Sequence, residues 1–204
     1  MNLFDNTPTK STNLLPYDGE VFYYGSIFPL EQSNLIMNKL LQSIEWKNDE
    51  AIIFGKHITT KRKVAWYGDY RYSYAYSKTT KDALPWTKDL IEIKSHVEKI
   101  LQRKFNSCLL NLYHNGEEGM AYHSDDEKSL ERHGVIASLS LGAERKFYFK
   151  HKTSKETIGL ILEAGSLLTM QGATQDYWLH RLPTTKKIHQ PRINLTFRNM
   201  DSDK

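Results

Sequence analysis

The residues best suited to carry chemistry are His123, Asp125 and His180. His123 and Asp125 lie two positions apart in AYHSDDE, and on an extended chain residues i and i+2 point to the same side. An imidazole and a carboxylate can therefore converge on one metal ion, with His180 of DYWLHRLP as a third ligand. Two histidines and one carboxylate leave positions open on the metal, as in non-haem Fe(II) oxygenases. The H-x-D pair alone also fits surface polar residues or hydrogen-bonded core groups.

A second pattern points to a small anionic ligand. PRINLTFR, read as a strand, places polar residues on one face and only apolar residues on the other. The polar face consists of Arg192, Asn194, Thr196 and Arg198. Arginine is rarely buried unless paired, and its planar fork binds a carboxylate through two hydrogen bonds. We expect a barrel interior that binds a dicarboxylate, into which Asn111 and Tyr113 of LLNLYHN also point; the alternative is a solvent-facing strand.

These residues must be positioned by a mixed α+β fold. Apolar spacing predicts helices at 29–44 and 85–103, with Pro85 in a first turn. Residues 51–78 predict a hairpin and further strands. Eight short strands without an intervening helix then indicate a barrel or jelly roll, braced by the two helices. They are expected at 107–113, 120–123, 135–141, 145–151, 157–163, 166–170, 177–181 and 192–199. We divide the chain into an extended arm (1–18) and one domain (19–204), with a hairpin lid at about 50–80 and the jelly-roll core at about 105–200.

Composition narrows the functional class. The 204 residues include one cysteine, Cys108, which excludes an intramolecular disulfide and a cysteine-based zinc cluster. No run approaches about 18 apolar residues, which excludes a transmembrane helix, and the N-terminus lacks a secretory pattern. We expect a cytoplasmic, monomeric protein. Residues 1–50 carry a net charge of −4 and residues 51–204 a net charge of +8, which favours a polyanionic partner.

Taken together, these motifs resemble the AlkB family of Fe(II)/2-oxoglutarate dioxygenases. The matching motifs are N-x-Y at Asn111, H-x-D at His123, the later His180, and R-x5-R at Arg192. Their order and spacing agree throughout, and the resemblance covers roughly residues 50–200. It implies a double-stranded β-helix (jelly-roll) fold.

The resemblance also implies cofactors and an activity. Fe(II) is assigned to His123, Asp125 and His180. The cosubstrate 2-oxoglutarate is assigned to Asn111, Tyr113, Arg192, Arg198 and, as a helper, Thr196. With O2, such an enzyme hydroxylates the N-alkyl carbon of 1-methyladenine or 3-methylcytosine and releases succinate, CO2 and an aldehyde. DNA repair by oxidative demethylation is the implied function. The alternatives are the same chemistry on RNA or protein, and a non-catalytic nucleic-acid-binding module.

An alkylated ring nitrogen is hidden in a duplex, so its base must be flipped out or supplied in a single strand. By resemblance to the duplex-preferring AlkB branch, we expect a base pocket formed by Tyr74, Tyr76, Ser77, Glu127 and Arg62. Glu127 is expected to contact the exocyclic amine of the base. The two tyrosines also fit ordinary half-buried sheet positions.

The segment Ile53-Phe54-Gly55 resembles the finger hairpin of that same branch. An apolar wedge driven between base steps opens a duplex, and nearby cations hold the phosphates. We assign the wedge to Ile53, Phe54 and Gly55, and the backbone contacts to Lys56, Lys61 and Lys63. The alternative is a buried hairpin phenylalanine. GATQDYWLHRLP is more similar to the single-strand-preferring branch, so single- and double-stranded alkylated DNA both remain expected partners.

Overall fold

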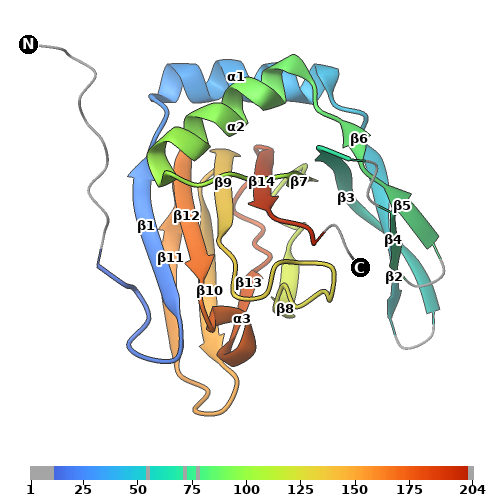
Figure 1. Ribbon diagram of the computed structural model, residues 1–204. Helices are drawn as coiled ribbons and strands as arrows, with labels where there is room; N and C mark the ends of the chain where they lie inside the picture. Colours follow the sequence, from blue (N-terminus) through green and yellow to red (C-terminus); the bar gives the residue numbers. More distant parts are fainter. Residues whose placement is uncertain (1–11, 54–55, 71–72, 77–78, 202–204) are drawn as a thin grey trace, which may run out of the picture.

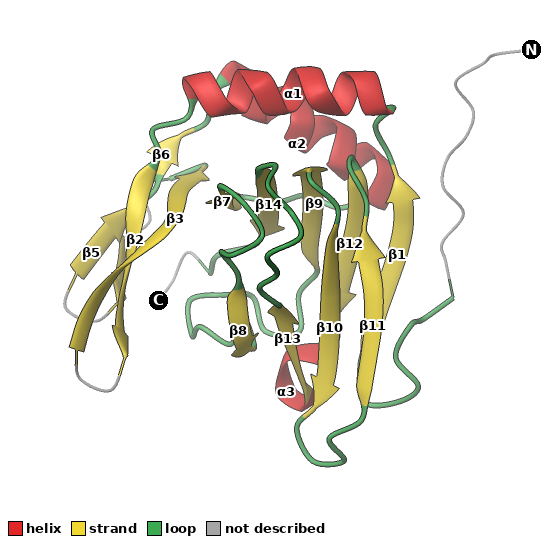
Figure 2. Cartoon of the chain, turned by 180° about the vertical axis from the view of Figure 1, so that it is seen from behind, coloured by secondary structure: helices red, strands yellow, loops and turns green. Residues whose placement is uncertain are grey.

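The computed structural model describes residues 12–53, 56–70, 73–76 and 79–201. Two antiparallel sheets lie face to face (Figure 1; Figure 2). The major sheet has the order β1-β12-β9-β14-β7-β3-β2, with β6 parallel to β3. Its strands are β1 (Glu20–Ser26), β2 (Lys47–Ile53), β3 (Lys56–Gly68), β6 (Leu84–Pro85), β7 (Ser107–Tyr113), β9 (Ile136–Gly142), β12 (Ser166–Gln171) and β14 (Arg192–Arg198).

The minor sheet carries the order β11-β10-β13-β8. Its strands are β11 (Thr157–Leu162), β10 (Arg145–His151), β13 (Trp178–Leu182) and β8 (Met120–His123). A separate hairpin consists of β4 (Ser73–Tyr76) and β5 (Thr79–Asp82), and it projects with β2 and β3 at one side of the molecule (Figure 1). The expected α+β fold with a jelly-roll core is confirmed. No helix in the described part of the chain is long and apolar enough to span a membrane.

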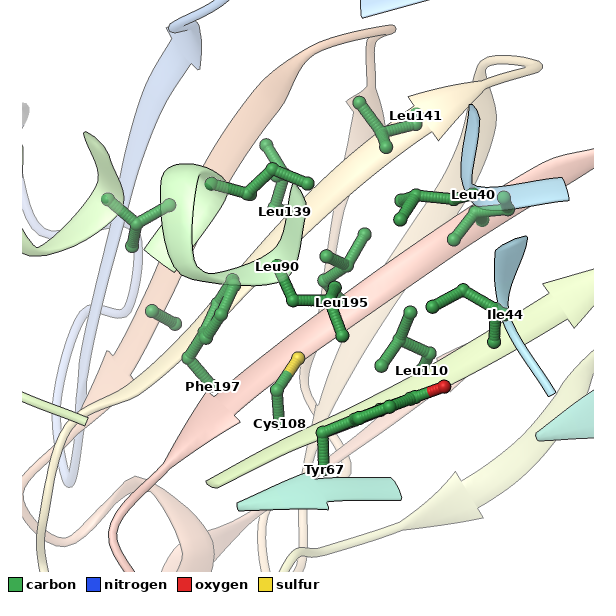
Figure 3. Packing of buried hydrophobic residues seen from close by; sticks show 14 of the residues in the cluster. Leu40, Ile44, Tyr67, Leu90, Cys108, Leu110, Leu139, Leu141, Leu195 and Phe197 are labelled. Atoms are coloured by element: carbon green, nitrogen blue, oxygen red, sulfur yellow. The ribbon is translucent and has the colours of Figure 1, made fainter. Parts of the chain in front are cut away.

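Helices α1 (Leu30–Ser43) and α2 (Lys88–Leu101) pack against one face of the major sheet. Figure 3 shows Leu40 of α1 and Leu90 of α2 over sheet residues that include Leu195. All three side chains are 0% exposed. This apolar layer holds the central strands in place, so their other face is fixed as well.

The expected first turn at Pro85 is wrong, because Pro85 belongs to β6. The helix begins instead after Thr87, whose side-chain oxygen accepts a hydrogen bond from the Leu90 amide at 3.3 Å. A hydroxyl at the N-cap satisfies an amide that has no partner within the helix, which proline cannot do.

A second apolar cluster lies between the two sheets. It joins Val21 of β1 with Phe149 of β10 and Trp178 of β13. Leu15 also belongs to this cluster and is 3% exposed, so residues 12–18 lie against the body of the protein. The Trp178 indole donates a hydrogen bond to the Tyr17 carbonyl at 3.1 Å. The division into an arm and one domain stays a prediction.

The eight strands expected after residue 105 are present, within one or two residues at their ends. Besides the start of α2, two elements differ from expectation. The short helix α3 (Thr174–Tyr177) lies between β12 and β13, where an uninterrupted run of strands was expected, and β1 was not predicted. α3 matters for the site because it contacts the metal-ligand segment, whereas β1 pairs with β12 at the edge of the major sheet.

Candidate active site

His123, Asp125 and His180 converge at one point. One ligand atom from each residue lies within 4.8 Å of the others. The Nε2 atoms of His123 and His180 lie 3.6 and 3.7 Å from the same Asp125 carboxylate oxygen. The minor sheet produces this arrangement, because His180 of β13 is paired directly with His123 of β8. Residues 57 positions apart in the sequence thus form one ligand face.

The protonation states of these groups suit a divalent metal. The His123 Nδ1 atom is 2.9 Å from the Ala121 carbonyl oxygen. Since a carbonyl only accepts, the ring proton lies on Nδ1 and the Nε2 lone pair is free. Burial lowers the pKa of His180 to about 4, so this ring is neutral at neutral pH. Burial alone would raise the pKa of Asp125, but the positive charges of Arg198, His180 and His123 together outweigh it, and the pKa is lowered. The neutral imidazole of His180 and the ionised carboxylate of Asp125 are the forms that bind metal.

Asp125 is held from two further sides. Arg198 of β14 places its Nη1 atom 3.4 Å from the second Asp125 oxygen. The Asp125 amide donates to the Gln175 side-chain oxygen at 2.9 Å. Gln175 belongs to α3 and was missed by the sequence analysis. A four-residue helix has too few positions to show an apolar period, so no signal marked it.

The triad opens into a cavity of about 1530 Å³. The polar face of β14 lines it, and none of that face is solvent-exposed: the exposed fractions are 2% for Arg192, 9% for Asn194, 9% for Thr196 and 7% for Arg198. Asn111 and Tyr113 of β7 line the same cavity. The solvent-facing strand considered above is therefore wrong, and the polar face points into the molecule.

Hydrogen bonds join this polar face into a network. Arg192 Nη2 donates to Ser140 Oγ at 2.9 Å and to Asn194 Oδ1 at 2.8 Å. Asn194 Oδ1 also accepts from Ser138 Oγ at 2.9 Å, and its amide donates to Thr196 at 2.8 Å. The serines of β9 were absent from the expected site. Their alternation in ASLSLGA was the available signal.

Three buried arginine donors in this cavity have no partner within the described part of the chain. They are the Nε atoms of Arg62, Arg192 and Arg198. Burial lowers the pKa of Arg192 to about 10, which reflects a cation removed from water without a carboxylate beside it. Buried polar groups are normally satisfied. The orphaned donors fit an anionic ligand in the cavity, and two separated guanidinium groups fit one with two carboxylates.

Arg62 and Glu127 also line this cavity. Arg62 is 8% exposed, forms an ion pair with Asp49 and lies 5.9 Å above the Tyr113 ring. The Arg198 Nη1 atom lies 3.5 Å from Glu127 Oε1, whereas Glu127 Oε2 is buried and has no hydrogen-bond partner among the described residues. Both residues thus touch residues expected to hold cofactors, and their role toward a base stays a prediction.

The other residues of the expected base pocket and wedge divide into two groups. Lys61 and Lys63 lie on β3, where Lys61 is exposed and Lys63 half-buried. The backbones of Ile53, Lys56, Tyr74 and Tyr76 lie on strands, but their side chains fall outside the described part. Phe54, Gly55 and Ser77 lie outside the described residues altogether.

A jelly roll that presents two histidines, an aspartate and buried arginines to one cavity defines the class of Fe(II)/2-oxoglutarate oxygenases. Residues 20–198 match the model of the 2OG-Fe(II) oxygenase superfamily. Human alpha-ketoglutarate-dependent dioxygenase alkB homolog 3 is 37% identical over 193 residues, which cover 90% of this chain and 67% of that protein. Human DNA oxidative demethylase ALKBH2 is 36% identical over 188 residues, covering 87% of this chain and 72% of that protein. The chain belongs to the AlkB family of Fe(II)/2-oxoglutarate-dependent dioxygenases.

Solved structures support the fold. A structure titled "The structure of OsALKBH1" matches with a TM-score of 0.61 at 14% identity, covering 91% of this chain and 98% of that chain. The chain spans about two thirds of the length of the human alkB homolog 3. Fe(II) and 2-oxoglutarate are the cofactors typical of the family, and the His123–Asp125–His180 triad fits iron. The expected enzyme class and cofactors are confirmed.

Proposed function

We propose that this protein is a DNA repair enzyme that oxidatively removes N-alkyl groups from bases such as 1-methyladenine and 3-methylcytosine. We further propose that it acts as a monomer on DNA inside the cell. The observation that carries the proposal is one cavity that holds a His/Asp/His triad, unpartnered arginine donors and a wall from the β2–β3 hairpin. The human relative ALKBH2 is named a DNA oxidative demethylase, which supports this substrate class.

In this proposal, His123, Asp125 and His180 hold Fe(II). When bound, Fe(II) and 2-oxoglutarate would supply the oxidising chemistry that, with O2, hydroxylates the N-alkyl carbon, with succinate, CO2 and an aldehyde as products. The chain contributes orientation and exclusion of water. His180 is 5% exposed, and its ring stacks on Phe147 at 5.7 Å. This apolar neighbour keeps solvent from one side of the triad.

The positions of the two arginines of β14 support one orientation of 2-oxoglutarate in the cavity. Arg198 lies beside the triad, 3.4 Å from Asp125, whereas Arg192 lies at the far end of the same strand face. We assign the carboxylate next to the metal to Arg198 and the distal carboxylate to Arg192 and Tyr113. Asn111 and Thr196 line the space between these ends.

For the base we retain the pocket formed by Tyr74, Tyr76, Ser77, Glu127 and Arg62. A flipped base needs surfaces to stack on and acceptors for its exocyclic amine. The buried Glu127 Oε2, which has no partner in the part of the chain that the structure describes, supplies an acceptor in the cavity. We retain Ile53, Phe54 and Gly55 as the wedge and Lys56, Lys61 and Lys63 as phosphate contacts.

Asp125→Ala tests the metal assignment, and Asp126→Ala is the control because Asp126 is an adjacent acid outside the triad. We expect Asp125→Ala to keep its thermal unfolding transition, to lose Mn(II) binding and to lose formaldehyde release from methylated DNA. Asp126→Ala should retain both properties. Asp125→Ala protein that binds Mn(II) like wild type would contradict the assignment.

A substrate panel tests the nucleic acid. Methylated single-stranded DNA, duplex DNA, RNA and a methylated peptide are compared by formaldehyde release. The proposal expects the DNA substrates to be turned over fastest; RNA or peptide as the best substrate would replace it with the corresponding alternative.

Phe54→Ala should impair turnover of duplex much more than of single-stranded DNA. Equal losses on both substrates would remove the wedge.

A further inference from the structure

Arg145, the first residue of β10, is a buried cation outside the site described above. It is 2% exposed. Its guanidinium donates to four backbone carbonyl oxygens: Asn115 at 3.3 Å, Gly116 at 3.2 Å, Glu118 at 2.9 Å and Pro183 at 2.8 Å. An arginine is an unusual choice for this task, because carbonyl dipoles compensate its charge only in part.

These acceptors belong to two loops that flank the 2-oxoglutarate end of the cavity. Residues 114–119 follow Tyr113 of β7, and residues 183–191 precede Arg192 of β14. The loops are also joined directly, since Gly116 donates to the Ile188 carbonyl and accepts from the Thr185 amide, both at 2.7 Å. Arg145 therefore holds the end of β7 and the beginning of β14 in place.

Tyr113 and Arg192 meet at those points. They face each other across the β7–β14 ladder, and the Arg192 guanidinium lies 5.5 Å from the Tyr113 ring centre. Any movement of the two loops would therefore move the two residues that we assign to the distal carboxylate.

Charge gives Arg145 a second effect. In the described part of the chain, neither Arg145 nor Arg192 forms an ion pair with a carboxylate. The nearby Glu118 carboxylate instead accepts from the His114 amide at 2.9 Å. Burial lowers the pKa of Arg192, and the positive charge of Arg145 lowers it further. Two buried like charges that repel each other are both stabilised when an anion binds between or beside them.

We propose that Arg145 is a positioning residue for the distal carboxylate of 2-oxoglutarate: it orients Tyr113 and Arg192 through the two loops and adds a second buried positive charge behind them. This inference rests on the proposed placement of 2-oxoglutarate in the cavity. It assigns Arg145 no contact with the cosubstrate. If Arg145 only stabilised the fold, its replacement would weaken ligands with and without a distal charge equally.

The test compares two acids that differ only at the distal end. Binding of 2-oxoglutarate and of 2-oxovalerate, in which a methyl group replaces the distal carboxylate, is measured by calorimetry on Mn(II)-loaded protein without O2. We expect Arg145→Met to raise the Kd of 2-oxoglutarate about tenfold and to change that of 2-oxovalerate less than about threefold, because only the former carries the distal charge. Arg145→Lys keeps the charge and should show a smaller rise.

Lys146→Met is the control, since it removes the same charge from the exposed neighbouring position. Its 2-oxoglutarate Kd should stay within about twofold of wild type. If Arg145→Met weakens both acids equally, or neither, the proposal is overturned. Should Arg145→Met fail to fold, Arg145→Lys decides: a selective rise of about threefold supports the proposal, and an unchanged or equal response overturns it. Wild-type protein that binds both acids equally would instead overturn the placement of 2-oxoglutarate.

Discussion

At the scale of single residues, the metal site depends on groups that bind no metal. The Asp125 carboxylate faces Arg198, and its amide is bonded to Gln175. The side chain is therefore ionised and oriented before any ion arrives. Such supporting hydrogen bonds reduce the reorganisation that binding requires, and their loss typically weakens metal binding.

Replacing Gln175 tests this support. Gln175→Met keeps the length of the side chain but removes the acceptor for the Asp125 amide. We expect the Kd for Mn(II) to rise about 10- to 100-fold, measured by titration of the metal-free protein. Gln171→Met is the control, because Gln171 bonds Glu20 at an exposed position instead. Unchanged Mn(II) affinity in Gln175→Met would show that the bond does not support the site.

A second residue-scale prediction concerns pH. The pKa of Asp176 is lowered chiefly by the hydrogen bond from His133, at 2.7 Å, with Arg132 as a smaller cause. A carboxyl with a lowered pKa adds stability above its ordinary pKa, and this stability is lost as the pH falls through the folded-state value. His133→Gln should raise the pKa of Asp176 toward its ordinary value, measured by NMR titration. Arg132→Gln should have the smaller effect; the reverse order would contradict the geometry.

At the scale of elements, α1 shows how the site is supported from behind. Its buried side packs on the major sheet, and the opposite faces of the same strands line the cavity. β14 makes this clearest, because Leu195 lies in the helix layer and its neighbour Thr196 lies in the cavity. A substitution that disturbs the packing on one side of this strand therefore also moves the cavity side chains on its other side.

Two leucines of α1 provide a matched pair. Leu40 is 0% exposed, whereas Leu35 is 59% exposed. We expect Leu40→Ala to lower the free energy of unfolding by about 2–5 kcal/mol, because it leaves a cavity against the sheet. Leu35→Ala should change it by less than about 0.5 kcal/mol. Urea denaturation measures both values, and similar losses in the two variants would contradict the packing.

At the scale of the whole molecule, Cys108 reports on the integrity of this core. It is the single cysteine of the chain, lies in β7 and is 0% exposed. Burial raises the pKa of its thiol, so the reactive thiolate is scarce in the native state.

A thiol reagent should therefore label Cys108 only when the core opens. We expect labelling in native buffer to be about 10³-fold slower or more than in denaturing urea. Leu40→Ala should accelerate native labelling in line with its lost stability. Native labelling at the rate of a free thiol would contradict the structure.

Local patterns predicted much of this molecule. The strict alternation in RINLTFR placed β14 and assigned its two faces, and the positions of Asn111 and Tyr113 assigned the cavity face of β7, because successive side chains of a strand point to opposite sides. The α2 start was misplaced at Pro85 because proline suits both a first helical turn and a strand edge. The contact between Gln175 and Asp125 joins residues 50 positions apart, and only the tertiary fold creates it.

The two sheets divide the chemistry between them. The metal ligands come from β8, the segment after it and β13 of the minor sheet, whereas the arginines come from β14 of the major sheet. Arg198 joins the two sets of residues through its contacts with Asp125 and Glu127. A molecule that chelates the ion and also reaches Arg192 would contact both sheets and link them. Cosubstrate analogues should therefore raise the unfolding free energy of both sheets together, and not only that of the residues that contact the ligand.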